Sequence, residues 1–273
     1  MEQTCYRHPN RETRVSCSNC GRPICPDCMT PTPVGMRCPE CARERTKVTR
    51  GAGEASLFAR APATFILIAA NVAVFFAEIA TGSGGFGEIT SSLIPEFGLF
   101  GPSVASGEWY RLLTSAFLHA SLFHIAGNMI LLFFLGRILE PGIGTPRFVM
   151  LYFVSLFAGS FGALLLSPDS LSIGASGAVF GVLAATFVIA RGRGVDALAS
   201  SVGVLILLNL AFSLGVPGIS IGAHLGGLAG GVICALFILG GERGMLGERH
   251  LPMELLAMAA IGFFSIAAAI TVA

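Results

Sequence analysis

Four polar side chains that could carry out nucleophilic catalysis lie within long apolar stretches of the chain. Ser176 stands in a Gly-Ala-Ser-Gly segment, and His224 follows Gly-Ala at the start of another apolar stretch. A neutral serine hydroxyl is a poor nucleophile, and a neighbouring imidazole that accepts its proton is the usual remedy. His124 and Asn128 are four residues apart, so they share one helix face and could both donate hydrogen bonds to a developing oxyanion. Together these residue types predict a site for acyl transfer.

A second set of reactive side chains lies before residue 42 and has the spacing of metal ligands. It consists of four pairs, each separated by two residues: Cys5 and His8, Cys17 and Cys20, Cys25 and Cys28, Cys38 and Cys41. Zinc takes four nitrogen or sulfur ligands in a tetrahedron, so two pairs per ion and two zinc ions account for all eight residues. Both ions would be structural, because protein ligands fill every coordination position and leave none for a substrate water.

A disulfide framework is the alternative for the same cysteines. It is disfavoured because the segment holds seven cysteines, and the odd one pairs with a histidine at ligand spacing. No secretory signal precedes the first long apolar run, which begins near Ala63. We therefore expect these cysteines to start out reduced in the cytosol.

Charge is distributed unevenly along the 273 residues. Residues 1–60 contain ten of the 17 basic and six of the 16 acidic residues, whereas residues 61–273 contain seven and ten. These few charges cannot cover a water-soluble globule of that size, so the second part is expected to be an intrinsic membrane protein. The first part is short enough to need a metal or disulfide staple. Its basic excess lacks interleaved aromatic residues, so a cytoplasmic protein partner is favoured over nucleic acid.

Apolar windows of about membrane length predict an all-α polytopic membrane protein with seven helices. The windows cover residues 63–81, 119–139, 147–166, 174–190, 197–214, 221–240 and 253–272. The first two windows are joined by a semi-apolar connection from Gly82 to Leu118, which is long enough to indicate a function of its own.

The arginines between these windows are concentrated in the loops on one side of the membrane. If the amino terminus is cytoplasmic, Arg111 alone lies in an outer loop, and the inner loops hold Arg137, Arg147, Arg191, Arg193, Arg243 and Arg249. This distribution predicts a multi-pass plasma-membrane protein with a cytoplasmic amino terminus, an outer carboxyl terminus and an outer long connection. The helices with His124, Ser176 and His224 would all run inward, so these side chains fall at similar depth. Sixteen arginines against one lysine favour a bacterial origin.

Small residues would let the proposed helices approach each other closely. Glycines recur at a spacing of four in the windows 174–190 and 221–240, as Gly177 and Gly181, Gly226 and Gly230, and Gly227 and Gly231. Such small-residue faces permit backbone contact between membrane helices. A serine on one helix and an imidazole on the other could then share a hydrogen bond.

Four separated motifs occur in order along the chain: Glu108-Trp109-Tyr110-Arg111, His119-x4-His124-x3-Asn128, Gly174-Ala175-Ser176-Gly177 and Ala223-His224-x2-Gly227-x3-Gly231. Over about residues 60–240, this set resembles the rhomboid family of intramembrane serine proteases. The resemblance implies a six-helix core in which Ser176 is the nucleophile and His224 the general base, in a dyad without an acidic third member. It also implies an oxyanion hole made by the Ser176 backbone N–H, His124 and Asn128.

The resemblance further implies roles for side chains around this dyad. Phe180 matches the aromatic position that packs on the catalytic imidazole and orients it. Trp109 and Arg111 match the structural signature of the family's first loop, which is half-embedded in the bilayer, although Tyr110 intervenes between them here. We expect His119 to anchor this loop by hydrogen bonds rather than to take part in chemistry.

The amino-terminal segment resembles B-box and RING-type cross-braced zinc modules. In such modules the first and third ligand pairs share one ion, and the second and fourth pairs share the other. The resemblance implies one site made by Cys5, His8, Cys25 and Cys28 and a second made by Cys17, Cys20, Cys38 and Cys41.

These observations predict four segments: a zinc-binding module at 1–42, a basic juxtamembrane linker at 43–60, a rhomboid-like six-helix peptidase core at 61–240, and a cytoplasmic loop with a seventh transmembrane helix at 241–273. The predicted activity is that of a serine endopeptidase that needs no metal for catalysis. Its substrates would be transmembrane proteins that enter from the membrane lipid and unwind locally at the cleaved bond.

Other classes are distinguished by the residues that they require. A catalytically silent rhomboid-like scaffold would bind transmembrane helices without cutting them, and it normally lacks the serine or the histidine. A channel or transporter would use a chain of intramembrane acidic residues or an inverted repeat, and neither is evident. An intramembrane zinc protease would need H-E-x-x-H, which is absent, and the segment Gly192–Asp196 is one residue too long for the G-x-G-D of an aspartyl protease.

Overall fold

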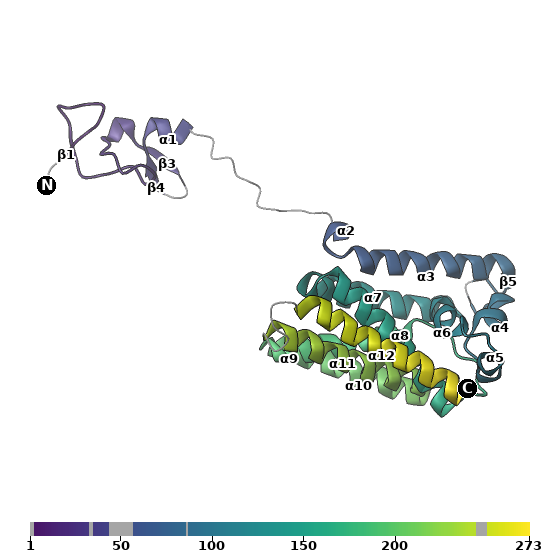
Figure 1. Ribbon diagram of the computed structural model, residues 1–273. Helices are drawn as coiled ribbons and strands as arrows, with labels where there is room; N and C mark the ends of the chain where they lie inside the picture. Colours follow the sequence, from purple (N-terminus) through teal and green to yellow (C-terminus); the bar gives the residue numbers. More distant parts are fainter. Residues whose placement is uncertain (1–2, 33–34, 44–56, 86, 244–249) are drawn as a thin grey trace. The chain divides into compact units, whose positions relative to one another are not determined.

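The computed structural model describes residues 3–32, 35–43, 57–85, 87–243 and 250–273. The chain divides into two compact units, Met1–Ala55 and Ser56–Ala273 (Figure 1). Each unit has its own cluster of buried residues. Most of the predicted basic linker, at 44–56, lies outside the described residues, as does residue Arg249 of the predicted inner loops.

The amino-terminal unit is small, and cysteine side chains make up most of its interior. Its elements are β1 (Gln3–Thr4), β2 (Glu12–Thr13), the 3-10 helix η1 (Pro26–Cys28), β3 (Thr30–Thr32), β4 (Gly35–Arg37) and α1 (Pro39–Arg43). β1 pairs antiparallel with β2, and β3 pairs antiparallel with β4. Besides the cysteines, the buried cluster contains Ile24, with Tyr6 and Met29 packed against it. A domain that buries so little apolar surface needs further stabilisation, for example by metal ions or disulfide bonds.

Among the described residues of the second unit, each predicted apolar window corresponds to one helix. These helices are α3 (Pro62–Thr81), α7 (Leu122–Ile143), α8 (Thr145–Leu166), α9 (Ser176–Gly192), α10 (Asp196–Gly215), α11 (Ile221–Glu242) and α12 (His250–Val272). Six of them are long and apolar enough to cross a membrane, and α9, with 17 residues, is shorter. The prediction of an all-α polytopic membrane protein is confirmed.

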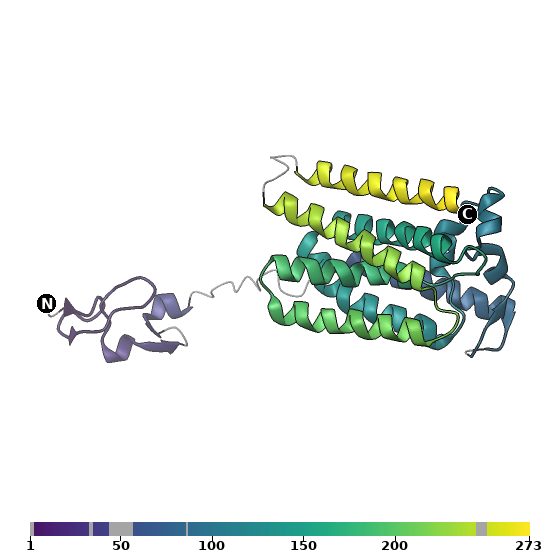
Figure 2. The same ribbon diagram turned by 90° about the horizontal axis from the view of Figure 1, so that it is seen from below.

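Helices α8, α9 and α11 lie side by side at the centre of the bundle, and α12 packs along α8 (Figures 1 and 2). The Arg147 Nη2 atom of α8 donates to Glu254 Oε1 of α12 at 3.1 Å, and the Glu254 side chain is fully buried. This ion pair fixes the seventh helix to the core. Helix α10 is the least enclosed of the six long helices, with only 17% of its apolar window buried within the protein.

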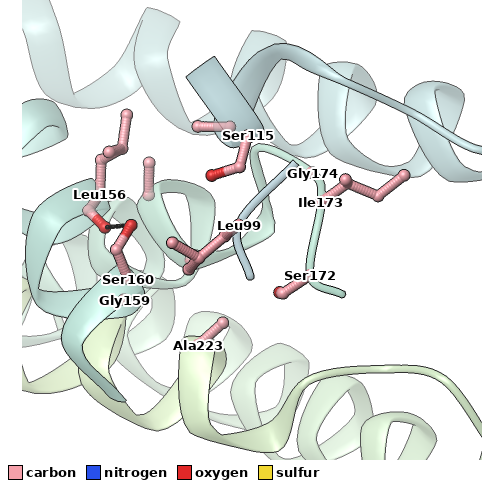
Figure 3. Close-up of a pocket in the computed structure, with 12 residues that line it drawn as sticks. Leu99, Ser115, Leu156, Gly159, Ser160, Ser172, Ile173, Gly174 and Ala223 are labelled. Carbon is pink, nitrogen blue, oxygen red and sulfur yellow. Dashed lines mark hydrogen bonds between the residues drawn. The ribbon is translucent and has the colours of Figure 1, made fainter. Parts of the chain in front are cut away.

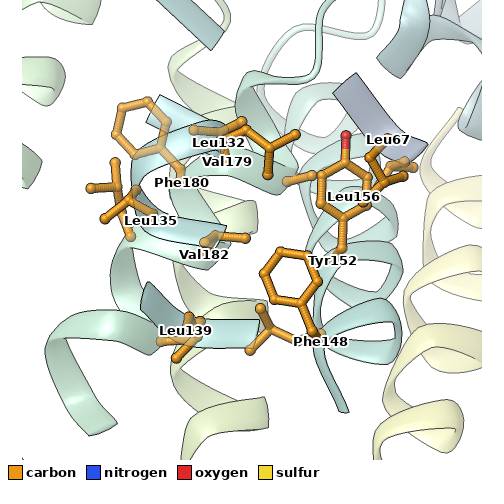
Figure 4. Packing of buried hydrophobic residues seen from close by; sticks show 14 of the residues in the cluster. Leu67, Leu132, Leu135, Leu139, Phe148, Tyr152, Leu156, Val179, Phe180 and Val182 are labelled. Carbon is orange, nitrogen blue, oxygen red and sulfur yellow. The ribbon is translucent and has the colours of Figure 1, made fainter. Parts of the chain in front are cut away.

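The apolar core lies between α7, α8 and α9 (Figure 4). Phe148 and Tyr152 of α8 and Leu132 of α7 are completely buried. Phe180 of α9 belongs to the same cluster. Because close-packed interiors resist displacement, this core fixes the helix that begins at Ser176.

Short elements fill the long connection between α3 and α7. They are β5 (Gly82–Ser83), β6 (Thr90–Ser91), α4 (Leu93–Phe97), α5 (Gly101–Ala105), α6 (Arg111–Thr114) and the 3-10 helix η2 (Ser115–Phe117); α2 (Leu57–Arg60) precedes α3. β5 and β6 form an antiparallel pair. Leu99 and Ser172 exchange two backbone hydrogen bonds of 2.9 Å, which tie this connection to the segment between α8 and α9. The last helix, α12, also contacts α5, so the carboxyl terminus lies at this end of the bundle (Figure 1).

Candidate active site and metal-ligand clusters

Ser176 begins α9, and His224 lies in the first turn of α11. Gly174 has a φ of +116°, a conformation that side chains disfavour, and this lets the chain turn sharply into α9. At the start of α11, the Ser220 side chain accepts a hydrogen bond from the Ala223 backbone N–H at 3.2 Å and so caps the helix. The two helix starts meet, and Ser176 Oγ lies 2.8 Å from His224 Nε2. This distance permits direct proton transfer between the two side chains.

Glycines on the two helices make this approach possible. A Cβ atom at Gly227 would overlap the carbonyl of Gly177, and one at Gly231 would overlap the carbonyl of Gly181. The predicted small-residue faces of α9 and α11 are therefore in direct backbone contact. The remaining predicted pair on α11 faces α8 instead, since a Cβ at Gly226 would overlap a backbone carbonyl of that helix.

Two further side chains hold the imidazole of His224. Phe180 stacks on it, with ring centroids 4.1 Å apart and ring planes inclined by 17°. Ser213, near the end of α10, places its Oγ 2.7 Å from His224 Nδ1, and the Ser213 hydroxyl also donates to the Asn209 carbonyl at 2.6 Å. Both nitrogens of the imidazole are thus engaged by serine hydroxyls.

Sequence reasoning missed Ser213, although a signal was present. The window 197–214 was expected to run outward, so its last turn falls at the depth where the windows of Ser176 and His224 begin. A serine in that turn was a candidate neighbour of the imidazole. Serine is common in membrane helices, however, and depth alone does not say which way its side chain points.

His124 and Asn128 lie one turn apart near the start of α7, which Ser121 caps by accepting from the His124 backbone N–H at 3.2 Å. The His124 imidazole lies against Gly174, because a Cβ there would be 2.6 Å from His124 Nε2. Asn128 Nδ2 donates to the His124 carbonyl at 3.0 Å. The structure thus places the imidazole close to the segment that precedes Ser176, and it directs one amide hydrogen of Asn128 to its own helix.

The loop residues singled out from the sequence separate into buried and exposed side chains. Arg111 is buried, and its Nη1 donates to the carbonyls of Pro95 and Gly98 at 2.8 Å each, which clasps the long connection. Trp109 is 56% exposed at the protein surface. His119 is buried beside the loop, and its imidazole Nδ1 lies 3.3 Å from the Phe117 carbonyl.

The backbone of His119 makes a second link that the sequence did not reveal. Its N–H lies 3.1 and 3.2 Å from the two carboxylate oxygens of Glu78, a fully buried residue near the end of α3. The end of the long connection is therefore attached to the first long helix. His119 is therefore bonded to α3 through its backbone and to its own loop through its ring, and its role as an anchor stays a prediction.

A cavity of about 20 Å³ lies beside the start of α9 (Figure 3). The long connection, the segment between α8 and α9, and the three central helices α8, α9 and α11 form its walls. The lining residues are Leu99, Ser115, Ala116, Leu156, Gly159, Ser160, Ser172, Ile173, Gly174, Gly177, Ala178 and Ala223. Figure 3 shows the labelled side chains of Ser115, Ser160 and Ser172 around this space. A polar cavity of this volume has room for one water molecule.

The amino-terminal unit gathers the eight predicted metal ligands into two sets. One set contains Cys5, His8, Cys25 and Cys28, and the other contains Cys17, Cys20, Cys38 and Cys41, with the ligand atoms of each set within 4.8 Å of one another. These are the two sets that the cross-brace resemblance implies. All eight cysteines of the chain, including Cys234 in α11, are free thiols.

The spacing within each set fits a tetrahedral zinc ion. Zn–S bonds of about 2.3 Å and Zn–N bonds of about 2.0 Å place neighbouring ligand atoms roughly 3.5–3.8 Å apart. His8 Nδ1 lies 3.3 Å from Cys25 Sγ and 3.5 Å from Cys28 Sγ. In the second set, Cys20 Sγ and Cys38 Sγ are 3.8 Å apart. Both sets can therefore bind a metal ion.

Hydrogen bonds between side chains join the segments that carry these ligands. Tyr6 and Arg7 both donate to the Glu40 carboxylate of α1, which joins the first ligand loop to the last. The hydrogen bond from Tyr6 lowers the pKa of Glu40 to about 2.

The fold and the site together define a class of protein: a bundle of apolar helices that holds a serine hydroxyl hydrogen-bonded to an imidazole. Residues 106–241 match the Rhomboid domain. The chain is 34% identical over 216 residues to Rhomboid protease GluP of Bacillus subtilis, a match that covers 77% of this chain and 42% of that protein. It is 33% identical over 135 residues to Putative rhomboid protease YdcA of the same species, covering 48% of this chain and 67% of that protein.

A plant protein matches as well. RHOMBOID-like protein 1 of Arabidopsis thaliana is 35% identical over 152 residues, which cover 53% of this chain and 39% of that protein. The chain thus spans about two fifths of the length of GluP and of this plant protein. The chain belongs to the rhomboid family of multi-pass membrane proteins, as its four motifs predicted.

Proposed function

We propose that this chain is an intramembrane serine endopeptidase that cleaves peptide bonds in or near transmembrane segments of other membrane proteins. The observation that carries the proposal is the 2.8 Å hydrogen bond between Ser176 Oγ and His224 Nε2, two side chains 48 residues apart on different helices. A pair of this kind supplies both the nucleophile and the base for acyl transfer. Membership of the rhomboid family and the similarity to Rhomboid protease GluP support the same activity.

In this mechanism His224 Nε2 takes the hydroxyl proton while Ser176 Oγ attacks the scissile carbonyl carbon. The tetrahedral intermediate collapses, the C–N bond breaks, and the imidazolium gives the proton to the leaving amine. A water molecule then loses a proton to His224 and attacks the acyl ester. As the ester C–O bond breaks, the imidazolium returns this proton to Ser176 Oγ, which restores the hydroxyl and releases the carboxylic acid. The cavity beside the start of α9 would be able to hold that water.

The oxyanion would be stabilised by the backbone N–H of Ser176 and by the side chains of His124 and Asn128. The contact of the His124 ring with Gly174 supports this role, because it places a ring nitrogen near the residue pair that precedes the nucleophile. Preorganised donors of this kind contribute strongly where water is excluded. Phe180 would orient the imidazole by stacking, and neither a metal nor a carboxylate is required.

The substrates would be transmembrane proteins that reach the site from the membrane lipid. A carbonyl inside a helix is already hydrogen-bonded, so the cleaved segment must unwind, which favours glycine, proline or small residues near the bond. The alternative is a catalytically silent rhomboid-like scaffold that binds the same segments. The Ser176 and His224 contact favours the protease, because a scaffold does not need it.

The other segments of the chain would flank this enzyme core on both sides of the sequence. We propose that residues 1–42 bind two structural zinc ions and contact a cytoplasmic protein, that 43–60 link this module to a peptidase core at 61–240, and that 241–273 add an inner loop and a seventh helix. The amino terminus would be cytoplasmic and the carboxyl terminus outside, in the plasma membrane of a bacterium. The ligand spacing in both Cys/His clusters supports zinc.

A fluorophosphonate serine-hydrolase probe tests the proposal directly. The detergent-solubilised chain should be labelled and should cleave a model transmembrane substrate, and Ser176→Ala and His224→Ala should each abolish both signals, because nucleophile and base act as a unit. Ser265→Ala is a matched control, since the hydrogen bond of Ser265 in the described part of the chain is to the Ile261 carbonyl of its own helix, at 2.9 Å. Labelling that persists in Ser176→Ala would refute the assignment, and a folded native chain without labelling or cleavage would favour the scaffold.

A further inference from the structure

We propose that Ser213 is a positioning residue that fixes the tautomer and orientation of His224, an inference that rests on the proposed protease function. The Ser213 hydroxyl lies 2.7 Å from His224 Nδ1, on the side of the ring opposite Ser176. A third group in this position decides which imidazole nitrogen carries the proton. For a serine protease that choice is essential, because only an unprotonated Nε2 can accept the proton of the nucleophile.

The direction of the hydrogen bonds follows from the number of protons available. A serine hydroxyl has one hydrogen to donate and two lone pairs with which to accept. Its Oγ lies 2.6 Å from the Asn209 carbonyl, which can only accept, so the Ser213 hydrogen is committed to that carbonyl. The lone pairs of Ser213 then face His224 Nδ1, which must be the donor. This arrangement leaves Nε2 free to accept from Ser176.

The burial of Ser213 supports a specific role. Helix α10 is the least enclosed of the long helices, and its buried residues are only Ala199, Val202 and Ser213. The two others are small apolar residues in the first half of the helix. Ser213 lies near the opposite end of this exposed helix, and its contact with His224 of α11 accounts for its burial.

A neutral hydroxyl also suits the surroundings better than the carboxylate of a water-soluble serine protease. A charge within membrane-spanning helices is costly, whereas a hydroxyl that is bonded on both sides is not. Ser213 therefore orients the imidazole as the third residue of a catalytic triad does, but without a negative charge. The Ser213 oxygen that accepts from His224 carries no charge. We therefore expect the removal of this hydroxyl to lower the rate about tenfold, which is less than the effect of removing a triad carboxylate.

Kinetics of three α10 variants test this inference. Ser213→Ala should lower kcat for a model transmembrane substrate about tenfold and leave KM unchanged, whereas Ser213→Thr should retain most of the activity because it restores the hydroxyl. Ser201→Ala is the matched control: Ser201 is exposed on the same helix and makes the same kind of bond, to the Ala197 carbonyl at 2.9 Å, so the native rate is expected. Native kcat in Ser213→Ala, or an equal loss in Ser213→Thr, would overturn the inference.

The tautomer itself can be read without enzymatic activity. In ¹⁵N-histidine-labelled protein, with the His224 signals assigned by comparison with His224→Gln, the native chain should carry the proton on Nδ1, and Ser213→Ala should show a mixture of tautomers. A native His224 protonated on Nε2 would overturn the inference even if the variants failed to fold. Failure of the proposed function is a separate result, namely an unlabelled Ser176 in the native chain.

Discussion

Asn128 and His124 share one face of α7, but their polar atoms are engaged differently. The His124 ring touches Gly174, whereas Asn128 Nδ2 donates one hydrogen to the His124 carbonyl at 3.0 Å. The side-chain amide carries two hydrogens, so one remains for an oxyanion. Asn128 would therefore contribute a single hydrogen bond among three donors, without being indispensable to the reaction.

Asn128→Ala should consequently lower kcat without abolishing cleavage. Removal of one oxyanion donor typically costs about 10²–10³ in rate, and we expect a loss at or below that range because two donors remain. Cleavage of a model transmembrane substrate measures the effect. Asn209→Ala is the matched control, since that amide makes the same bond to a carbonyl four residues earlier, Leu205, but on α10. A loss as complete as that of Ser176→Ala would show that Asn128 has a different role.

At the scale of residues, the sequence predicted which side chains come together more reliably than the direction in which each side chain points. Residue type and depth pointed to Ser176 and His224, and the structure brings their side chains within 2.8 Å. The position of Phe180 came from the family resemblance alone, and the structure stacks this ring on the imidazole. The depth of Ser213 was predictable but its contact with His224 was not, because only the packing of α10 against α11 decides that its hydroxyl, rather than that of another serine, meets the ring.

At the scale of elements, the site depends on how closely α9 and α11 approach. Gly227 and Gly231 pack directly on the carbonyls of Gly177 and Gly181. These atoms belong to the backbone, so they cannot move aside as a flexible side chain could. A methyl group at either position on α11 must push the helices apart, and the serine and imidazole at their starts would separate with them.

Gly227→Ala should therefore lower activity more than tenfold and lower the melting temperature, since overpacking a core typically costs about 1–3 kcal/mol. The substrate-cleavage rate and thermal unfolding in detergent measure the two effects. Gly127→Ala on α7 is the matched control, because a Cβ at that position meets no atom of the described residues within 4 Å apart from its chain neighbours and the backbone of its own helix. If both variants kept native activity, close contact between α9 and α11 would not be what holds the site together.

The helices themselves were predictable to within a few residues, because apolar windows of membrane length have few other interpretations. Two of the helices begin a few residues later than predicted, and the local structure explains the difference. Helix α7 begins at Leu122 rather than 119 because Ser121 caps it, and α9 begins at Ser176 rather than 174 because Gly174 has a positive φ. Contacts between distant elements were not predictable: Glu140 of α7 accepts from the backbone N–H of Thr64 at 2.8 Å and so caps α3 across 76 residues.

At the scale of the whole molecule, the arginine distribution predicts which side of the membrane each end occupies. Fusions of a periplasm-active phosphatase and of a cytoplasm-fluorescent protein at Ala273 should report an outer carboxyl terminus. The same reporters placed after Arg243 should report the cytoplasm, since one helix separates the two positions. The contact of α12 with α5 agrees with an outer terminus on the side of the long connection. A cytoplasmic Ala273 would contradict the predicted orientation of every helix.

The two compact units of the chain have different sources of stability. The first unit has a minimal apolar core around Ile24 and two closed sets of four ligands, so metal binding should supply most of its folding free energy. The helical unit has an extensive core of its own, and the proposed reaction of its serine and imidazole would use no cation. A strong chelator should therefore unfold residues 5–41 and leave cleavage by the detergent-solubilised chain largely intact.

Metal content by mass spectrometry and cleavage rate, followed across one chelator titration, measure both responses. About two zinc ions per chain should be lost with little change in rate, because all four positions of each tetrahedron are filled by protein and none binds a hydrolytic water. Cys17→Ser, which removes one ligand of the second set, should halve the metal content and likewise preserve the rate. Loss of zinc and activity together, while the helical unit stays folded, would contradict independent sites and would instead show that the amino-terminal unit controls the protease directly.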